Sequence, residues 1–242
     1  MFKTVSMFKR LSFKITLLAA FFFTSVIIAV ALLMGSQSGN FVVQVQSGDI
    51  ETSIAITESL NDISTYGDKI TTDGIGNISN NTALYFMNDG VEDLKEIAAN
   101  TGVNKELVDL YCYTFYVANT GDSIVNIEFE MNIAQVTKGL DKAIRVMSFN
   151  QKTGKYTIYQ AIDEPDWEYP SYESIGQPKI FKDDRIVYTE QDYLLPMSPG
   201  NLNEEGSYIK YSVFVWVEGW DPQCTEDLYR STIQFELTIK VI

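Results

Sequence analysis

The residue types with the most chemical potential lie close together between Val215 and Asp227, in the sequence VWVEGWDPQCTED. Grouped carboxylates can bind a cation, and tryptophan offers a ligand a large apolar surface. A glycine lets the chain turn, and a proline ends strand pairing because it has no N–H to donate. We therefore predict a corner between two strands, whose acids could bind a cation, cap a helical turn or simply be solvated. The corner residues are Trp216, Glu218, Gly219, Asp221 and Pro222, followed by Glu226 and Asp227.

The chain has two cysteines, Cys112 and Cys224, and the second lies in this corner. An even pair of cysteines in an oxidising compartment more often forms a disulfide than a metal site. Such a bridge would stabilise the protein by about 4–5 kcal/mol in the chain-entropy model, because it closes a long loop. We expect a disulfide between Cys112 and Cys224, with two buried free thiols as the alternative.

The chain has no histidine, and this restricts the reactions it can catalyse. Ser-His-Asp and Cys-His catalysis and zinc sites built on imidazole all require that residue. Two cysteines are too few for a structural zinc site. We therefore predict no catalytic residues, no bound cofactor and a function that is not enzymatic.

One stretch leaves a minor alternative, a carbohydrate-binding or hydrolytic surface protein. The segment 163–172 (DEPDWEYPSY) mixes acids with Trp167, Tyr169 and Tyr172. Glycosidases need two carboxyl groups roughly 5–10 Å apart at the scissile bond. The same composition is also typical of a solvated polar loop, which is the reading we favour.

Calcium is the one metal for which candidate ligands exist. Asp68, Asp73 and Asn77 belong to a glycine-rich segment expected to be a loop, and Asp89 follows it. Their spacing does not match an EF-hand. Since Asp, Asn and Gly are also the usual residues of turns, calcium binding stays a secondary hypothesis.

The first forty residues indicate an export signal. Residues 1–14 form a basic tail, and the charge-free run Ile15–Met34 has 20 residues, enough for roughly 30 Å of helix and a bilayer core. The positive-inside rule keeps the tail cytoplasmic and places the rest outside. We predict a single-pass signal anchor, a linker over 35–40 and an extracellular domain over 41–242. Cleavage near Ala29–Ala31 or within 35–38, giving a secreted protein, is the alternative.

The exported part is acidic, since no acidic residue precedes Asp49 and the whole chain carries a formal charge of −14. A negative field repels nucleic acid, so we predict no nucleic-acid partner. The expected partners are the membrane, through residues 15–34, and a surface protein or a second copy of the chain.

Apolar residues alternate with polar ones along most of the domain, which is typical of antiparallel strands with one buried face. We predict an all-β antiparallel sandwich, jelly-roll or immunoglobulin-like, with a small helical insertion over about 91–109. The expected strands are Phe41–Gln46, Ile50–Thr57, Ala83–Met87, Leu110–Asn119, Ile124–Gln135, Ala143–Phe149, Tyr156–Ala161, Arg185–Thr189, Ile209–Val217 and Ile233–Val241.

Three stretches match a known pattern: residues 113–121 (YTFYVANTG), 136–146 (VTKGLDKAIRV) and 215–224 (VWVEGWDPQC). In this order they resemble a group of membrane-anchored surface proteins of Gram-positive bacteria with no assigned activity. That group is distantly similar to the TasA/camelysin family of secreted β-sandwich matrix proteins. The similarity spans roughly residues 41–62 and 110–242.

The resemblance implies a jelly-roll-like fold and a role at the cell envelope. Camelysin-like proteins are often called metallopeptidases, but this chain lacks histidine to support that activity. The long apolar run and the insertion near 91–109 depart from the fibre-forming members. We expect a membrane-tethered envelope or surface-binding protein, with a secreted, TasA-like fibre subunit that assembles by strand addition as the alternative.

Overall fold

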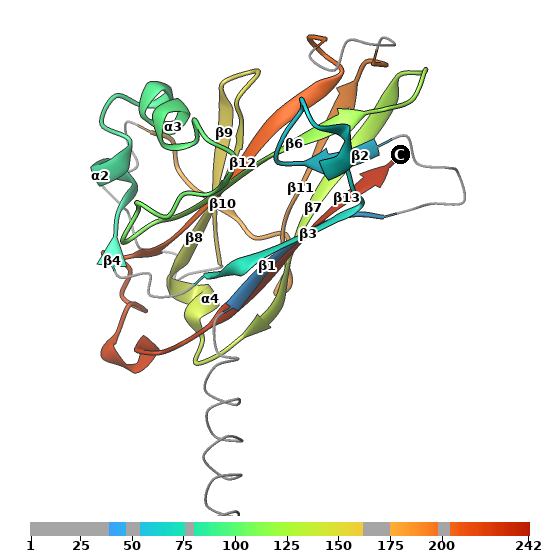
Figure 1. Ribbon diagram of the computed structural model, residues 1–242. Helices are drawn as coiled ribbons and strands as arrows, with labels where there is room; N and C mark the ends of the chain where they lie inside the picture. Colours follow the sequence, from blue (N-terminus) through green and yellow to red (C-terminus); the bar gives the residue numbers. More distant parts are fainter. Residues whose placement is uncertain (1–38, 47–53, 76–79, 162–174, 198–203) are drawn as a thin grey trace, which may run out of the picture. The chain divides into compact units, whose positions relative to one another are not determined.

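The computed structural model describes residues 39–46, 54–75, 80–161, 175–197 and 204–242. Residues Gly39–Ile242 form one compact unit, in which strands predominate and helices are few and short (Figure 1). Among the described residues, no helix has the length and apolar character needed to cross a membrane. The predicted basic tail, anchor and first part of the linker lie outside the described residues, as does the loop 163–172.

The first sheet, here called sheet A, has five strands in the order β11-β7-β13-β1-β3. Alternation along β7 and β13 turns every second side chain inward, as their sequence pattern predicts. The outward positions are polar or partly exposed. The strands are β1 (Gly39–Gln46), β3 (Lys69–Ile75), β7 (Val125–Val136), β11 (Ile186–Leu194) and β13 (Ile233–Val241).

The second sheet, sheet B, runs β10-β9-β8-β12-β6-β2, with β4 paired to β12 and β5 paired to β6. Its central strands are apolar on both faces, which explains the uninterrupted hydrophobic run in β6. The strands are β2 (Ile54–Thr57), β4 (Asn80–Asn81), β5 (Gly102–Val103), β6 (Tyr111–Asn119), β8 (Ile144–Asn150), β9 (Lys155–Gln160), β10 (Lys179–Ile180) and β12 (Tyr208–Glu218).

One main core joins the two sheets. Inward side chains of sheet A, such as Phe129 and Phe235, belong to the same buried cluster as Val213 and Tyr211 of sheet B. The rings of Phe129 and Tyr211 stack with their centres 4.4 Å apart. A mostly β chain with two sheets around a shared core is consistent with the predicted β-sandwich.

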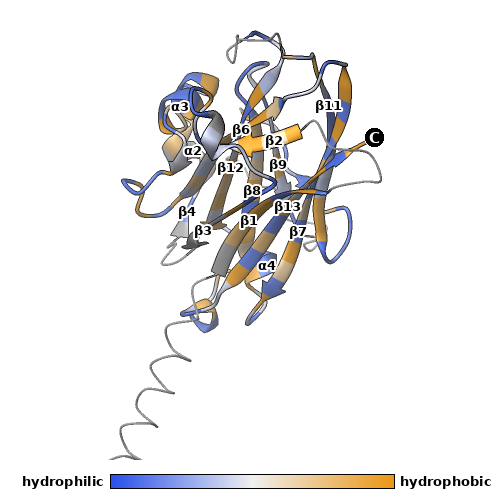
Figure 2. Cartoon of the chain, turned by 45° about the vertical axis from the view of Figure 1, so that its right-hand side comes forward, coloured by the Kyte–Doolittle hydropathy of each residue, from blue (hydrophilic) through white to orange (hydrophobic). Residues whose placement is uncertain are grey.

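A helical layer buries the outer face of sheet B. It contains α2 (Ala83–Phe86) and α3 (Val91–Ile97), which lie beside sheet B in Figure 2. Both helices contribute to a second buried cluster with Phe214 and Trp216. The remaining helices are single turns: η1 (Ile63–Thr65), α4 (Leu140–Ala143) and η3 (Glu226–Leu228). Because this second cluster covers the outer face of sheet B, that face can be apolar as well.

Two expectations about the elements are wrong, and a third, the helical insertion, holds only in part. The stretch Ala83–Met87 is helical instead of a strand, because Ala83 and Met87 lie four residues apart and are both buried on one helix face. The insertion over 91–109 is helical only in α3, since Gly102–Val103 pairs with β6. The glycine-rich segment thought to be a loop contains β3.

The sheets are also not wholly antiparallel. Strand β1 runs parallel to β13, with Phe41 opposite Phe235, and β9–β10 and β12–β4 are parallel too. The other strand pairs are antiparallel, including the predicted hairpin β8–β9. Sequence alternation reports which face a residue occupies, and it does not report the direction of the neighbouring strand.

Candidate functional site

The predicted corner is the connection between β12 and β13, residues 219–232. The backbone N–H of Gly219 donates to the carbonyl of Asn81 in β4, 2.8 Å away. The N–H of Asp221 then donates to Glu218, and the N–H of Cys224 donates to Asp221. These bonds fold residues 218–224 back over the end of sheet B, and the chain turns at Gly219.

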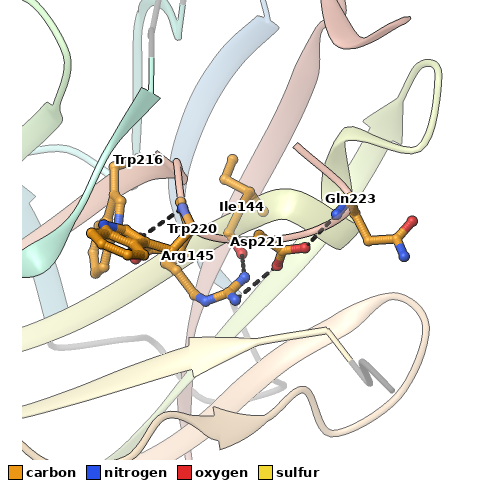
Figure 3. A network of polar contacts seen from close by, with 7 residues as sticks. Ile144, Arg145, Trp216, Trp220, Asp221 and Gln223 are labelled. Carbon is orange, nitrogen blue, oxygen red and sulfur yellow. Dashed lines mark hydrogen bonds and ion pairs between the residues drawn. The ribbon is translucent and has the colours of Figure 1, made fainter. Parts of the chain in front are cut away.

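A buried ion pair fastens this corner to the sheet (Figure 3). A nitrogen of the Arg145 guanidinium lies 2.8 Å from Oδ2 of Asp221, and both side chains are completely buried. Arg145 comes from β8, where it is paired in register with Trp216. The same guanidinium donates to the carbonyl of Ile144, and Oδ1 of Asp221 accepts from the N–H of Gln223.

A second buried carboxylate, Glu218, links the two tryptophans of the corner. Its Oε2 accepts from Nε1–H of Trp216 at 3.2 Å, and its Oε1 accepts from the backbone N–H of Trp220 at 3.5 Å. Trp216 is fully buried in the second cluster, whereas Trp220 is 58% exposed. Glu218 therefore connects a core anchor to an aromatic side chain presented to solvent.

These contacts decide between the roles left open for the corner acids. The carboxylates of Glu218 and Asp221 are buried and accept hydrogen bonds from the chain, so they hold the corner in shape. Glu226 and Asp227 are exposed and lie in the first turn of η3, where carboxylates favour the helix N-terminus. Pro222 is exposed, as a turn residue usually is.

The expected disulfide is not formed, since Cys112 and Cys224 are both thiols in the structure. Cys112 faces the helical layer with Met147 and Phe214, whereas Cys224 packs against the main core on the other side of sheet B. Two side chains on opposite faces of one sheet cannot be bridged without moving the backbone.

Burial raises the pKa of the Cys112 thiol to about 12. The pKa of Cys224 is also raised, first by burial and then by the charges of Asp221 and Glu218. Both shifts disfavour the thiolate, which is the form that binds metals and reacts with disulfides.

Three of the four calcium candidates belong to the described residues, and they lie at different places in the fold. Asp68 is exposed beside β3, Asp73 lies within β3, and Asp89 is exposed in the turn before α3, where its N–H donates to Asp93. Asn77 lies outside the described residues. Within the part of the chain that the structure describes, no three acidic or cysteine side chains are grouped so as to hold a metal ion.

A polar cluster that the sequence did not predict lies between the sheets. Glu190, on the edge strand β11, accepts hydrogen bonds from the hydroxyls of Ser148, Tyr159 and Tyr211, at 2.7–3.0 Å. The hydroxyl of Tyr211 also lies 3.0 Å from that of Tyr188. Burial, followed by the charge of Glu190, raises the pKa of Tyr159. These residues are widely separated in the sequence and lie on four different strands. Nothing in that pattern predicts that their side chains meet.

An open groove of about 820 Å³ lies on the helical layer. Its lining mixes apolar residues, such as Phe86 and Leu107, with polar ones, such as Asp93 and Asn104.

No protein-family model matches the chain, and no curated protein matches it.

Proposed function

We propose that this protein is a non-enzymatic, membrane-tethered, extracellular β-sandwich of the jelly-roll or immunoglobulin-like kind. Its role is structural in the cell envelope or consists of binding another surface component. The observation that carries the proposal is the structural role of the corner acids. Glu218 and Asp221 have the most chemical potential in the sequence, but both are buried and make contacts that hold the corner in shape.

Two further points support this role. The compact unit Gly39–Ile242 begins within the predicted linker, shortly after the predicted anchor ends at Met34, as expected for an anchor followed by one domain. The exposed surface offers a groove and an aromatic corner, which are features of recognition more than of chemistry.

The test is the state of the N-terminus in the native membrane. We expect the protein to stay in the pellet after alkaline carbonate extraction, with peptides from Ile15–Met34 still attached when the purified chain is digested. Recovery of a soluble chain that starts between residues 35 and 39 would contradict the tether. A hydrolase activity lost on substitution of a single carboxylate would contradict the non-enzymatic role.

The second candidate is a secreted fibre subunit that assembles by strand addition after cleavage. One observation favours it: β1 is the first element of the domain, and cleavage within 35–38 would leave this strand at the new N-terminus. Filaments visible by electron microscopy in the secreted fraction, together with that cleaved terminus, would support the fibre. A carbohydrate-binding role is the minor alternative, and glycan arrays would test it.

A further inference from the structure

Two large aromatic side chains are exposed in the β12–β13 connection. Trp220 is 58% exposed and Tyr229 is 73% exposed, although side chains of this size are usually mostly buried. They stand near the two ends of the connection, before and after η3. We call residues 219–231 the tip, and Figure 1 shows it in red at the same end of the domain as α4.

The tip is held in a defined shape. The buried Glu218 accepts a hydrogen bond from the backbone of Trp220 on one side of it. On the other side, Nζ of Lys138 donates to the carbonyl of Tyr229 at 2.5 Å. The guanidinium of Arg230 lies 5.3 Å from the centre of the Tyr229 ring, within the range of a cation–π contact.

Lys138 and Arg230 also share an uncommon backbone conformation. They are the two non-glycine residues with positive φ in the described part of the chain, at 55° and 60°. Steric clashes disfavour positive φ for residues other than glycine. Each such residue costs of order 1–3 kcal/mol when its surroundings impose this conformation. Both of them lie beside Tyr229, so the strain is concentrated where the exposed aromatic and basic side chains meet.

The chain enters the domain at this same end. Strand β1 is parallel to β13, and Phe41 is opposite Phe235, so the start of β1 lies beside the start of β13, where the tip ends. Residues 35–38 alone separate Gly39 from the end of the predicted anchor at Met34. Even fully extended, this connection reaches no more than roughly 18 Å.

The chemistry of the tip fits a membrane surface. Tryptophan and tyrosine are enriched at membrane–water interfaces, where the apolar ring meets the acyl chains and the polar atom meets the headgroups. Lysine and arginine at this depth contact lipid phosphates. This end of the otherwise acidic domain has balanced charges, with Lys138, Lys142 and Arg230 against Asp141, Glu226 and Asp227.

We propose that the tip docks onto the lipid headgroup region, with Trp220 and Tyr229 at the interface and Lys138 and Arg230 beside the phosphates. This inference rests on the proposed membrane tether, which brings the bilayer within reach of the tip. The partner is the lipid surface itself, and the contact fixes one orientation of the domain on the membrane.

The experiment uses the full chain in phosphatidylcholine vesicles whose acyl chains carry bromine close to the headgroup. Bromine quenches tryptophan emission at short range, and subtracting the emission of Trp220→Phe from that of the native chain isolates Trp220. We expect bromine to remove most of this difference signal. We expect the substitution to leave circular dichroism unchanged, since Trp220 is mostly exposed.

A matched control places a reporter at the other end of the domain. Tyr193 is 55% exposed and pairs with Asn126 at the start of β7, whereas the tip adjoins the end of β7 through Thr137 and Thr232. In the double substitution Tyr193→Trp, Trp220→Phe, we expect the new emission to be the same in brominated and ordinary vesicles.

The outcomes separate this inference from the tether on which it rests. If the chain floats with the vesicles but bromine leaves Trp220 unquenched, the tip contact is wrong and the tether stands; a protein partner at the tip would give this result. Equal quenching of both reporters would also overturn the proposed orientation. If the chain neither floats nor resists carbonate extraction, the tether and the tip contact fall together.

Discussion

Arg145 and Asp221 place opposite charges in the protein interior, 2.8 Å apart and shielded from water. Taking each ion out of water costs several kcal/mol, and their attraction offsets this cost only where further hydrogen bonds satisfy the remaining atoms. Ile144 and Gln223 supply such bonds here. The pair therefore adds little net stability, but the loss of either partner leaves a buried charge uncompensated.

Substituting Asp221→Asn should lower the free energy of unfolding by about 3–5 kcal/mol, because the Arg145 charge stays buried without its counterion. The double substitution Arg145→Met, Asp221→Leu should recover most of that loss. Urea denaturation of the full chain in detergent, followed by tryptophan emission, measures both. Asp227→Asn, at an exposed position, is the control and should change stability by no more than about 0.5 kcal/mol. An Asp221 variant as stable as this control would contradict the structural role of the pair.

The two thiols should differ sharply in reactivity. Cys112 is 1% exposed and its pKa is raised to about 12, whereas Cys224 is only partly buried. Because the thiolate is the reactive form, we expect iodoacetamide to modify Cys224 slowly in the native protein and Cys112 only after unfolding. Mass spectrometry without reductant reads out the result. Failure of either cysteine to react in denaturant would show that they are bridged after all.

At the scale of elements, the two sheets differ in how their outer faces are kept from exposing apolar side chains. Sheet A keeps a polar outer face, on which Lys240 lies 2.7 Å from Glu130. Sheet B is apolar on both faces and depends on α2 and α3 to cover the outer one. The helical layer is therefore part of the fold, although it is short and local in sequence.

Leu94, the fully buried residue of α3, tests this dependence. Substituting Leu94→Ala should lower the free energy of unfolding by about 2–5 kcal/mol, through lost burial and the cavity that remains. Increased binding of a hydrophobic dye would report exposure of the outer face of sheet B. Glu96→Ala, on the exposed side of the same helix, is the matched control. Equal effects of the two substitutions would argue that the layer is dispensable.

The tyrosine cluster between the sheets should make the fold sensitive to alkali. Burial raises the pKa of Tyr159, Tyr188 and Tyr211 in this cluster above the ordinary value of about 10. The folded state holds these tyrosine protons more tightly than the unfolded state does. The protonated tyrosines therefore stabilise the fold fully below pH ~10, and this stabilisation is lost as the pH rises further. We expect tyrosinate absorbance to rise steeply together with loss of near-ultraviolet circular dichroism. Titration of these groups well before unfolding would contradict their burial.

The sequence predicted those elements whose pattern is set locally. Alternation located β7, β12 and β13, and glycine and proline located the corner. It did not predict the parallel pairing of β1 with β13, because that contact joins residues far apart in the chain. At the corner, the sequence predicted a cysteine pair instead of the ion pair between Asp221 and Arg145, although Arg145 is the single charge in the apolar strand β8.

At the scale of the whole molecule, β1 is an interior strand on which the domain depends. Strand β1 lies between β13 and β3, and its inward residues Phe41, Val43 and Val45 are buried in the main core. Burying three such side chains contributes about 5–9 kcal/mol, which is comparable to the whole stability of a typical domain. The domain therefore includes β1, and we expect this strand to be required for stable folding.

Two truncated chains test this boundary. A chain that starts at Gly39 should fold and resist limited proteolysis, whereas one that starts at Ser47 should be degraded or aggregate. Adding a peptide of residues 39–46 to the second chain should restore part of its resistance. Folding of the shorter chain without the peptide would show that β1 is peripheral to the domain.

The pairing of β1 with β13 also constrains the order of events during folding. Strand β1 is synthesised first, but it can find its parallel neighbour only after the last residues are available, because Phe41 is opposite Phe235. Contacts with such long sequence separation slow folding and leave unpaired strands exposed to aggregation meanwhile. Completion of sheet A is thus a late step. For the exported protein that we propose, this step would follow translocation, and a chaperone outside the membrane would protect the unpaired strands until then.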